Sequence, residues 1–117
     1  MSKTLTILGC GYLGSALASR ALDNGWTVSA LTRNPDYVSE LKSIGLEVVV
    51  QSNLEDSNWH SELDADQDFV VNCVGSSSPN LDGYVKSYVE GQSSVMNWLK
   101  SGKVGTFVFT SLSLIHI

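Results

Sequence analysis

The sequence predicts a single α/β domain built on a doubly wound parallel sheet with strand order 3-2-1-4-5. Short apolar runs rich in β-branched residues alternate with segments whose apolar residues recur at helical spacing. The first apolar run ends in glycines spaced as GxGxxG, which is typical of a strand that turns into a helix. With 117 residues, 43% of them hydrophobic, the chain can bury one modest core.

The apolar runs and the helical segments give an expected order of elements. Strands are expected at residues 4–8, 27–31, 46–50, 69–74 and 106–110. Helices are expected at residues 12–24, 35–43, 57–63 and 81–100. Gly25, Gly45 and Gly102 each follow a helical segment and predict where it ends. Asn34 suits the N-cap of the second helix, and Pro35 suits its first position.

The glycines after the first strand predict a dinucleotide-binding turn, as in a Rossmann-type fold. Gly9 permits a tight turn, and Gly11 leaves room for a pyrophosphate against the backbone. Gly14 lets the following helix lie close on the sheet. The phosphates are expected at the helix N-terminus, beside Tyr12 and Leu13, where free N–H groups favour an anion.

The residues at the end of the second strand predict which cofactor binds. A carboxylate there accepts hydrogen bonds from the adenosine ribose of NAD, whereas an arginine accommodates the 2′-phosphate of NADP. The chain has Thr32 and Arg33 at this point, and the next acidic residue is Asp36. We therefore expect NADP in preference to NAD, with Arg33 on the phosphate and the Thr32 hydroxyl donating to it. Two alternatives stay open: NAD as the cofactor, and Arg33 as a solvated surface residue.

The charge and the hydropathy of the chain argue against two kinds of binding partner, nucleic acid and membrane. The formal net charge of −5 argues against nucleic acid, and no apolar stretch is long enough to span a membrane. The expected location is the cytoplasm, where Cys10 and Cys73 would stay reduced, although a redox pair between them is a second interpretation. No metal site is expected from the spacing of histidines and carboxylates. His60 is expected to be exposed, and Trp98 is expected to pack.

Two further segments complete a resemblance to a known family. Asn53-Leu54 follows the third strand, and Val74-Gly75 follows the fourth. Together with the glycine turn, the order of these segments resembles the N-terminal half of NAD(P)-dependent epimerases/dehydratases, within the extended and atypical short-chain dehydrogenase/reductase group. The resemblance implies that Asn53-Leu54, in place of the family's Asp-Leu, contacts the adenine. It also implies that Val74-Gly75 lies against the cofactor.

The resemblance extends to the fifth strand and sets expectations about catalysis. In the family that strand ends in serines, as at Ser111, and a catalytic Ser or Thr follows, where this chain has Leu112. No Tyr-x-x-x-Lys occurs in the sequence. The last residues, LSLIHI, equal the translation of a sequencing adaptor. We therefore expect an incomplete cofactor domain at residues 1–111, truncated after strand five, a non-native tail at 112–117, and no catalytic residue in the chain.

The resemblance also bears on substrate and assembly, and it leaves alternatives. It implies an oxidoreductase that acts on a small molecule, with nucleotide sugars among the candidates, and a homodimer of the full-length parent. A non-catalytic NADP sensor with the same fold is the first alternative. The cofactor domain of an unrelated dehydrogenase, such as an imino-acid or β-hydroxyacid reductase, is the second. A Ser or Thr after Ser111 and a Tyr-x-x-x-Lys downstream would favour the enzyme over the sensor.

Overall fold

The computed structural model describes residues 3–9, 12–73 and 89–109. The strands in this part of the chain form one parallel sheet in the order β3-β2-β1-β4-β5, which confirms the predicted topology. They are β1 (Thr4–Leu8), β2 (Thr27–Thr32), β3 (Val48–Gln51), β4 (Gln67–Asn72) and β5 (Val104–Phe109). The helices are α1 (Tyr12–Asp23), α2 (Pro35–Ile44), the single 3-10 turn η1 (Asn58–Ser61) and α4 (Gly91–Leu99).

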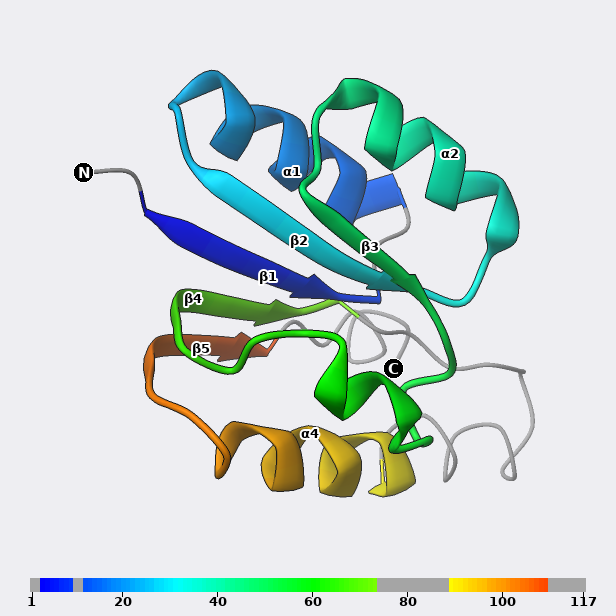
Figure 1. The fold of residues 1–117 in the computed structure, drawn as a ribbon, viewed down its shortest axis with the longest axis vertical. Helices are drawn as coiled ribbons and strands as arrows, with labels where there is room; N and C mark the ends of the chain where they lie inside the picture. The colour runs from blue at the N-terminus through cyan, green and yellow to red at the C-terminus, as the bar shows by residue number, and fades with distance from the viewer. Residues whose placement is uncertain (1–2, 10–11, 74–88, 110–117) are drawn as a thin grey trace, which may run out of the picture.

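The sheet lies between two helical layers, each with its own apolar core (Figure 1). On one face, Leu5 and Ile7 of β1 pack with Ala18 of α1 and Leu41 of α2. On the other face, the apolar side chains of the sheet pack with η1 and α4. The buried members of this second cluster are Leu8, Leu31, Val50, Leu54, Trp59, Leu63, Ala65, Val70, Val95 and Trp98. Because side chains alternate along a strand, neighbouring residues of β1 serve the two cores.

The glycine signals at the ends of α1 and α2 are confirmed by backbone geometry. Gly25 has φ +80° and Gly45 has φ +117°, a region that glycine enters without steric cost. After Gly25, the Trp26 N–H donates to the Ala21 carbonyl at 3.0 Å. After Gly45, the Leu46 N–H donates to the Leu41 carbonyl at 3.2 Å. Both helices therefore end in Schellman motifs, which satisfy carbonyls that a helix terminus leaves free.

Several predicted boundaries differ from the structure. The third strand begins at Val48 instead of residue 46, because the Leu46 N–H is used to close α2. The segment expected as a helix at 57–63 is only the η1 turn, and the fourth and fifth strands begin two residues early. Of the helix expected at 81–100, residues 91–99 form α4, while 81–88 lie outside the described residues.

Gly102 follows α4 as predicted, but a close contact explains it instead of a left-handed backbone. A Cβ at this position would lie 2.6 Å from the carbonyl carbon of Ala65 and 2.7 Å from its Cβ. Real Cβ atoms essentially never come that close to another heavy atom. Glycine therefore allows the turn between α4 and β5 to approach the segment that precedes β4.

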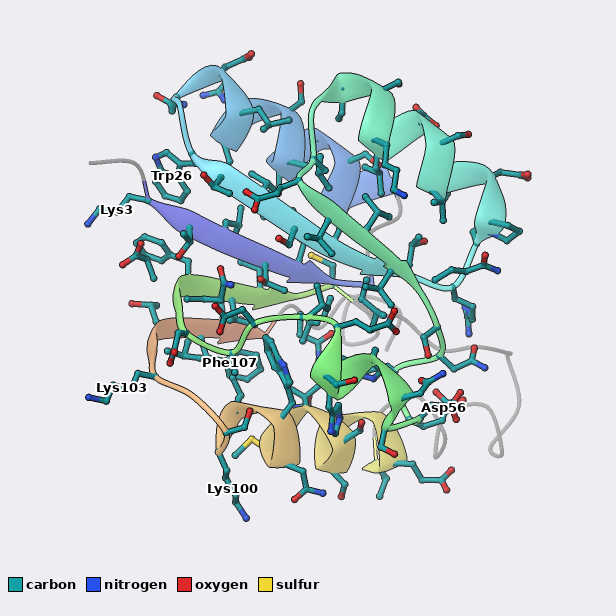
Figure 2. The ribbon with its side chains drawn as sticks, viewed as in Figure 1. Lys3, Trp26, Asp56, Lys100, Lys103 and Phe107 are labelled. Carbon is teal, nitrogen blue, oxygen red and sulfur yellow. The ribbon has the colours of Figure 1, made fainter. Side chains whose placement is uncertain are left out.

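At the edge of the sheet where the strands begin, a carboxylate joins two neighbouring strands through hydrogen bonds. Asp68 Oδ2 accepts the Thr4 N–H at 2.9 Å and the Thr4 hydroxyl at 3.2 Å, while the Asp68 N–H donates to Thr4 Oγ1 at 2.9 Å. These bonds join β1 and β4 near Lys3, far from the labelled Asp56 at the opposite edge (Figure 2). The bond from the Thr4 N–H lowers the pKa of Asp68.

Replacing Asp68 by asparagine is expected to remove stability at neutral pH and to flatten the acid side of the stability profile. Because the folded-state pKa lies below the unfolded value, the carboxylate stabilises the fold above about pH 4. That contribution is lost as the pH falls through the folded-state pKa. Melting temperatures of wild type and Asp68→Asn should therefore differ at about pH 7 and converge toward about pH 2. Glu47→Gln, which neutralises an exposed carboxylate, is the control and should show no such convergence.

Within the described residues, none of the helices has the length and apolar content that a bilayer-spanning segment needs.

Candidate cofactor site

The candidate site lies at the edge where the strands end. Leu8 of β1 is in register with Leu31 of β2 on one side and with Asn72 of β4 on the other. Thr32 at the end of β2 is in register with Gln51 at the end of β3. The next described helix after β1, α1, lies in one helical layer, and the next after β4, α4, lies in the other, so a crevice is expected between the ends of these two strands. In such folds ligands bind outside the carboxyl ends of the strands, at this point of reversal.

Gly9, the first residue after β1, has a backbone conformation that suits a tight turn. Gly9 has φ +77°, and its N–H donates to the Leu31 carbonyl at 2.9 Å. The chain enters α1 at Tyr12, only three residues later, and Gly14 is buried in the first turn of that helix. Gly11 and the side chains of Tyr12 and Leu13 lie outside what the structure describes. The N-terminus of a twelve-residue helix therefore lies close to the end of β1, where its dipole and free N–H groups favour an anion.

The turn after β2 presents Arg33 to solvent on a fixed backbone. The Thr32 side chain is buried, and its hydroxyl oxygen accepts the Asn34 N–H at 3.3 Å. Asn34 Oδ1 in turn accepts the Asp36 N–H at 2.9 Å and caps α2, as predicted. Arg33 lies between these two hydrogen bonds and is exposed. The backbone at Arg33 is thus fixed at the end of β2, and its exposed side chain carries five N–H donors.

The turn after β3 separates the two residues predicted to meet the adenine. The Asp56 N–H donates to the Asn53 carbonyl at 3.2 Å, which closes a four-residue turn. Asn53 is exposed, whereas the Leu54 side chain is buried in the core on the α4 side. The Ser52 N–H donates to the Thr32 carbonyl at 3.0 Å, so this turn begins directly beside the turn that carries Arg33. The Asn53 amide is therefore the polar side chain of the predicted pair that a ligand can reach.

The remaining predicted contacts fall outside the described residues. These are Val74 and Gly75 after β4. Cys10, Ser111 and the expected non-native tail at 112–117 also lie outside the described residues. The described part of β4 ends in Asn72, whose buried side chain donates from Nδ2 to Gln92 Oε1 of α4 at 2.9 Å. No group of three or more metal-binding side chains comes together in the part of the chain that the structure describes.

One prediction is wrong: His60 is not exposed. It is half-buried, and its Nε2 lies 2.8 Å from Ser94 Oγ of α4. Trp59 beside it is fully buried and is one of the largest core side chains, although it lies in a polar stretch of the sequence. The spacing of Gly91, Ser94 and Trp98 on one helical face was a signal that Ser94 is buried.

Comparison with known proteins identifies the family. A family model described as NAD(P)H-binding matches residues 9–116. The chain belongs to the NAD(P)H-binding family. The matched segment takes in the glycine turn, the turns after β2 and β3, and the end of β4. This match confirms the prediction that the chain binds a nicotinamide dinucleotide. It does not distinguish NAD from NADP. No curated protein is similar enough to this NAD(P)H-binding protein to match it.

Solved structures match nearly the whole length of this NAD(P)H-binding protein. A protein described as an NAD-dependent epimerase/dehydratase from Bacillus halodurans is 22% identical, with a TM-score of 0.77 over 97% of this chain and 54% of its own. UDP-glucose-4-epimerase from Stenotrophomonas maltophila, solved with NAD and formylated UDP-arabinopyranose, is 20% identical. Its TM-score is also 0.77, over 97% of this chain and 38% of its own. A protein described as a β-ketoacyl-ACP reductase is 21% identical, with a TM-score of 0.74 over 98% and 56%.

These likenesses confirm the Rossmann-type fold and, at the level of fold, the resemblance to epimerases/dehydratases and short-chain reductases. The chain spans between 38% and 56% of the length of these structures. Their activities belong to proteins that are longer than this chain.

Proposed function

We propose that this crevice binds NADP(H), and that the exposed Arg33 recognises the 2′-phosphate. The observation that carries the proposal is the turn after β2, where Thr32 stands in place of a carboxylate and Arg33 is held between two hydrogen bonds. A carboxylate at this point would repel a 2′-phosphate and favour the free ribose hydroxyls of NAD. A guanidinium offers charge-assisted, bidentate hydrogen bonds to the phosphate. The proton of the Thr32 hydroxyl is the second proposed donor.

The other parts of the site fit the rest of the cofactor. The positive φ of Gly9 and the N-terminus of α1 suit a pyrophosphate, with Gly11 and the first turn, Tyr12 to Gly14, beside it. The Asn53 amide can donate to or accept from the adenine edge, since it carries both kinds of group. Leu54 would contribute through its backbone, because its side chain lies in the core. Val74 and Gly75 remain proposed contacts on the side of β4.

We further propose that the chain is the cofactor-binding part of an epimerase/dehydratase-type oxidoreductase. The bound nicotinamide supplies hydride chemistry, and this chain's residues bind and orient it. The support is that the matched structures carry epimerase, dehydratase and reductase names, and one holds a UDP-sugar, so a nucleotide sugar is the proposed substrate class. Residues 1–111 are the proposed cofactor domain of a cytoplasmic homodimer. The three structures named above carry enzyme names, which supports the enzyme over the sensor as the preferred interpretation.

Calorimetric titration of the chain with NADPH and NADH tests the proposal. We expect NADPH to bind at least about tenfold more tightly than NADH, because charged hydrogen bonds to a phosphate stabilise a complex by about 1.5–3 kcal/mol. Equal affinities would overturn the NADP preference and leave dinucleotide binding in place. If the folded chain bound neither cofactor, the assignment of this crevice would be wrong.

A further inference from the structure

We infer that Ser94 of α4 is a positioning residue for the adenine side of the cofactor site. It acts through the backbone carbonyl of Asp56, and the imidazole of His60 fixes its orientation. The inference rests on the proposed function, because it assumes that the turn of residues 53–56 meets the adenine. It concerns residues that lie outside the glycine turn and outside the turn that carries Arg33.

The turn of residues 53–56 is held from two sides by the core beneath it. On one side, Ser94 Oγ donates to the Asp56 carbonyl at 2.7 Å. On the other side, the Trp59 indole N–H donates to the Leu54 carbonyl at 3.1 Å. The two carbonyls that a short polar turn would leave to water are thus bonded to α4 and to η1. The backbone of the turn is fixed, and the Asn53 side chain remains exposed above it.

Hydrogen-bond accounting assigns a direction to each contact of Ser94. A serine hydroxyl carries one proton and accepts through its oxygen. Ser94 donates its hydroxyl proton to the Asp56 carbonyl. Ser94 Oγ must therefore accept the hydrogen bond from His60 Nε2, which lies 2.8 Å away. The Nε2 atom therefore carries the imidazole proton. Burial lowers the pKa of His60, and the neutral ring has only this one N–H to donate.

The helix that carries Ser94 is itself fastened to the sheet and to the loop before β4. Gln92, two residues earlier, accepts from Asn72 at the end of β4 at 2.9 Å. The Trp98 indole N–H, one turn later, donates to the Leu63 carbonyl at 2.9 Å. Figure 2 shows Asp56 beside the first turn of α4, where Ser94 lies in the sequence of the helix. The helix thus fixes the position of the adenine-side turn relative to the ends of the strands.

Removal of the Ser94 hydroxyl leaves the Asp56 carbonyl and the His60 N–H without this partner. A buried polar group that loses its partner destabilises the arrangement that holds it, so the turn is free to move to other positions. The affinity for the ligand then falls, because binding of the adenine must also order the Asn53 amide. A merely structural serine would lower stability without changing how much Asn53 contributes to affinity.

A double-mutant cycle with adenosine 2′,5′-bisphosphate, a ligand that lacks the nicotinamide half, tests the inference. Ser94→Ala is expected to weaken this ligand and NADPH by the same factor, about five- to tenfold. In the Asn53→Ala background the same substitution should weaken either ligand by less than about twofold, because the two effects are coupled. Ser93→Ala, which removes the exposed neighbouring hydroxyl on α4, is the matched control and should bind like the wild type.

A second pair of variants keeps the test open if Ser94→Ala does not fold. His60→Gln places an amide N–H near the position of Nε2, whereas His60→Leu has no donor. We expect near-normal affinity for adenosine 2′,5′-bisphosphate in the first and weaker binding in the second. Wild-type affinity in Ser94→Ala, or independent effects in the cycle, would overturn the inference while cofactor binding stands. If the wild type bound neither ligand, the proposed function would fail first and the inference with it.

Discussion

Replacing Arg33 by alanine is expected to weaken NADPH binding by about ten- to hundredfold and to leave NADH binding nearly unchanged. The 2′-phosphate is the difference between the two cofactors, and Arg33 is the exposed cation in the turn where the adenosine ribose is expected. Thr32 has a neutral hydroxyl, so it cannot replace a guanidinium as the source of positive charge.

The measurement is a pair of titrations for each variant, with NADPH and NADH, at low and at high salt. Arg33→Lys retains the charge but not the planar pair of donors, so it should recover only part of the affinity. Lys42→Ala is the charge-matched control, since it removes an exposed cation from the other end of α2. The NADPH preference of the wild type should shrink as salt rises, because exposed ionic contacts are screened. NADPH affinity that is the same in wild type and Arg33→Ala would contradict the assignment.

The sequence was informative wherever a local rule decides the structure. Gly25 and Gly45 mark the ends of α1 and α2, because a left-handed residue is needed there and glycine supplies it at no steric cost. Asn34 and Pro35 mark the start of α2 by other local rules, because Asn34 caps the helix through its side chain and proline suits the first helical position. The order of the strands also followed from local patterns, since alternating strands and helices leave few arrangements with right-handed connections.

Contacts between distant segments were the part that the sequence did not reveal. Leu46 is predicted to lie in the third strand because it is apolar. Its N–H instead donates to the last turn of α2, so the strand begins two residues later. His60 lies in a polar stretch that suggests exposure, but its partner Ser94 is 34 residues away on a helix. Trp59 is buried for the same reason, since α4 and the sheet enclose it from both sides. Periodicity predicts which face of an element is buried, but it does not predict which polar group meets it there.

The candidate site could be predicted from the sequence only in part. The turns after β1, β2 and β3 could be placed together from sequence, because parallel strands end at one edge of the sheet. The different surroundings of Asn53 and Leu54 could not be predicted, since Leu54 belongs to a core that includes residues from later segments of the chain, such as Trp59 and Trp98. The adenine-side turn is therefore defined by η1 and α4 as much as by its own residues.

The largest loss of stability is expected from Trp98→Ala, because this side chain joins α4 to the rest of its core. The indole is fully buried, lies 5.2 Å from the Trp59 ring between centroids, and donates its N–H to the Leu63 carbonyl. Truncating a buried tryptophan costs about 3–5 kcal/mol, and small domains unfold with only about 5–15 kcal/mol. Urea denaturation should therefore show a much lower midpoint, or an unfolded protein at room temperature.

Two comparison variants separate packing from the hydrogen bond. Trp98→Phe keeps an aromatic ring and leaves the Leu63 carbonyl without this donor, so we expect a smaller loss of about 1–3 kcal/mol. Trp26→Ala removes a half-buried ring that stacks on Phe69 with centroids 5.1 Å apart, in the other core. It should cost roughly 1–2 kcal/mol, because part of that ring already faces water in the folded state. If Trp26→Ala and Trp98→Ala lost the same free energy of unfolding, the α4 core would not hold this fold together as its buried contacts indicate.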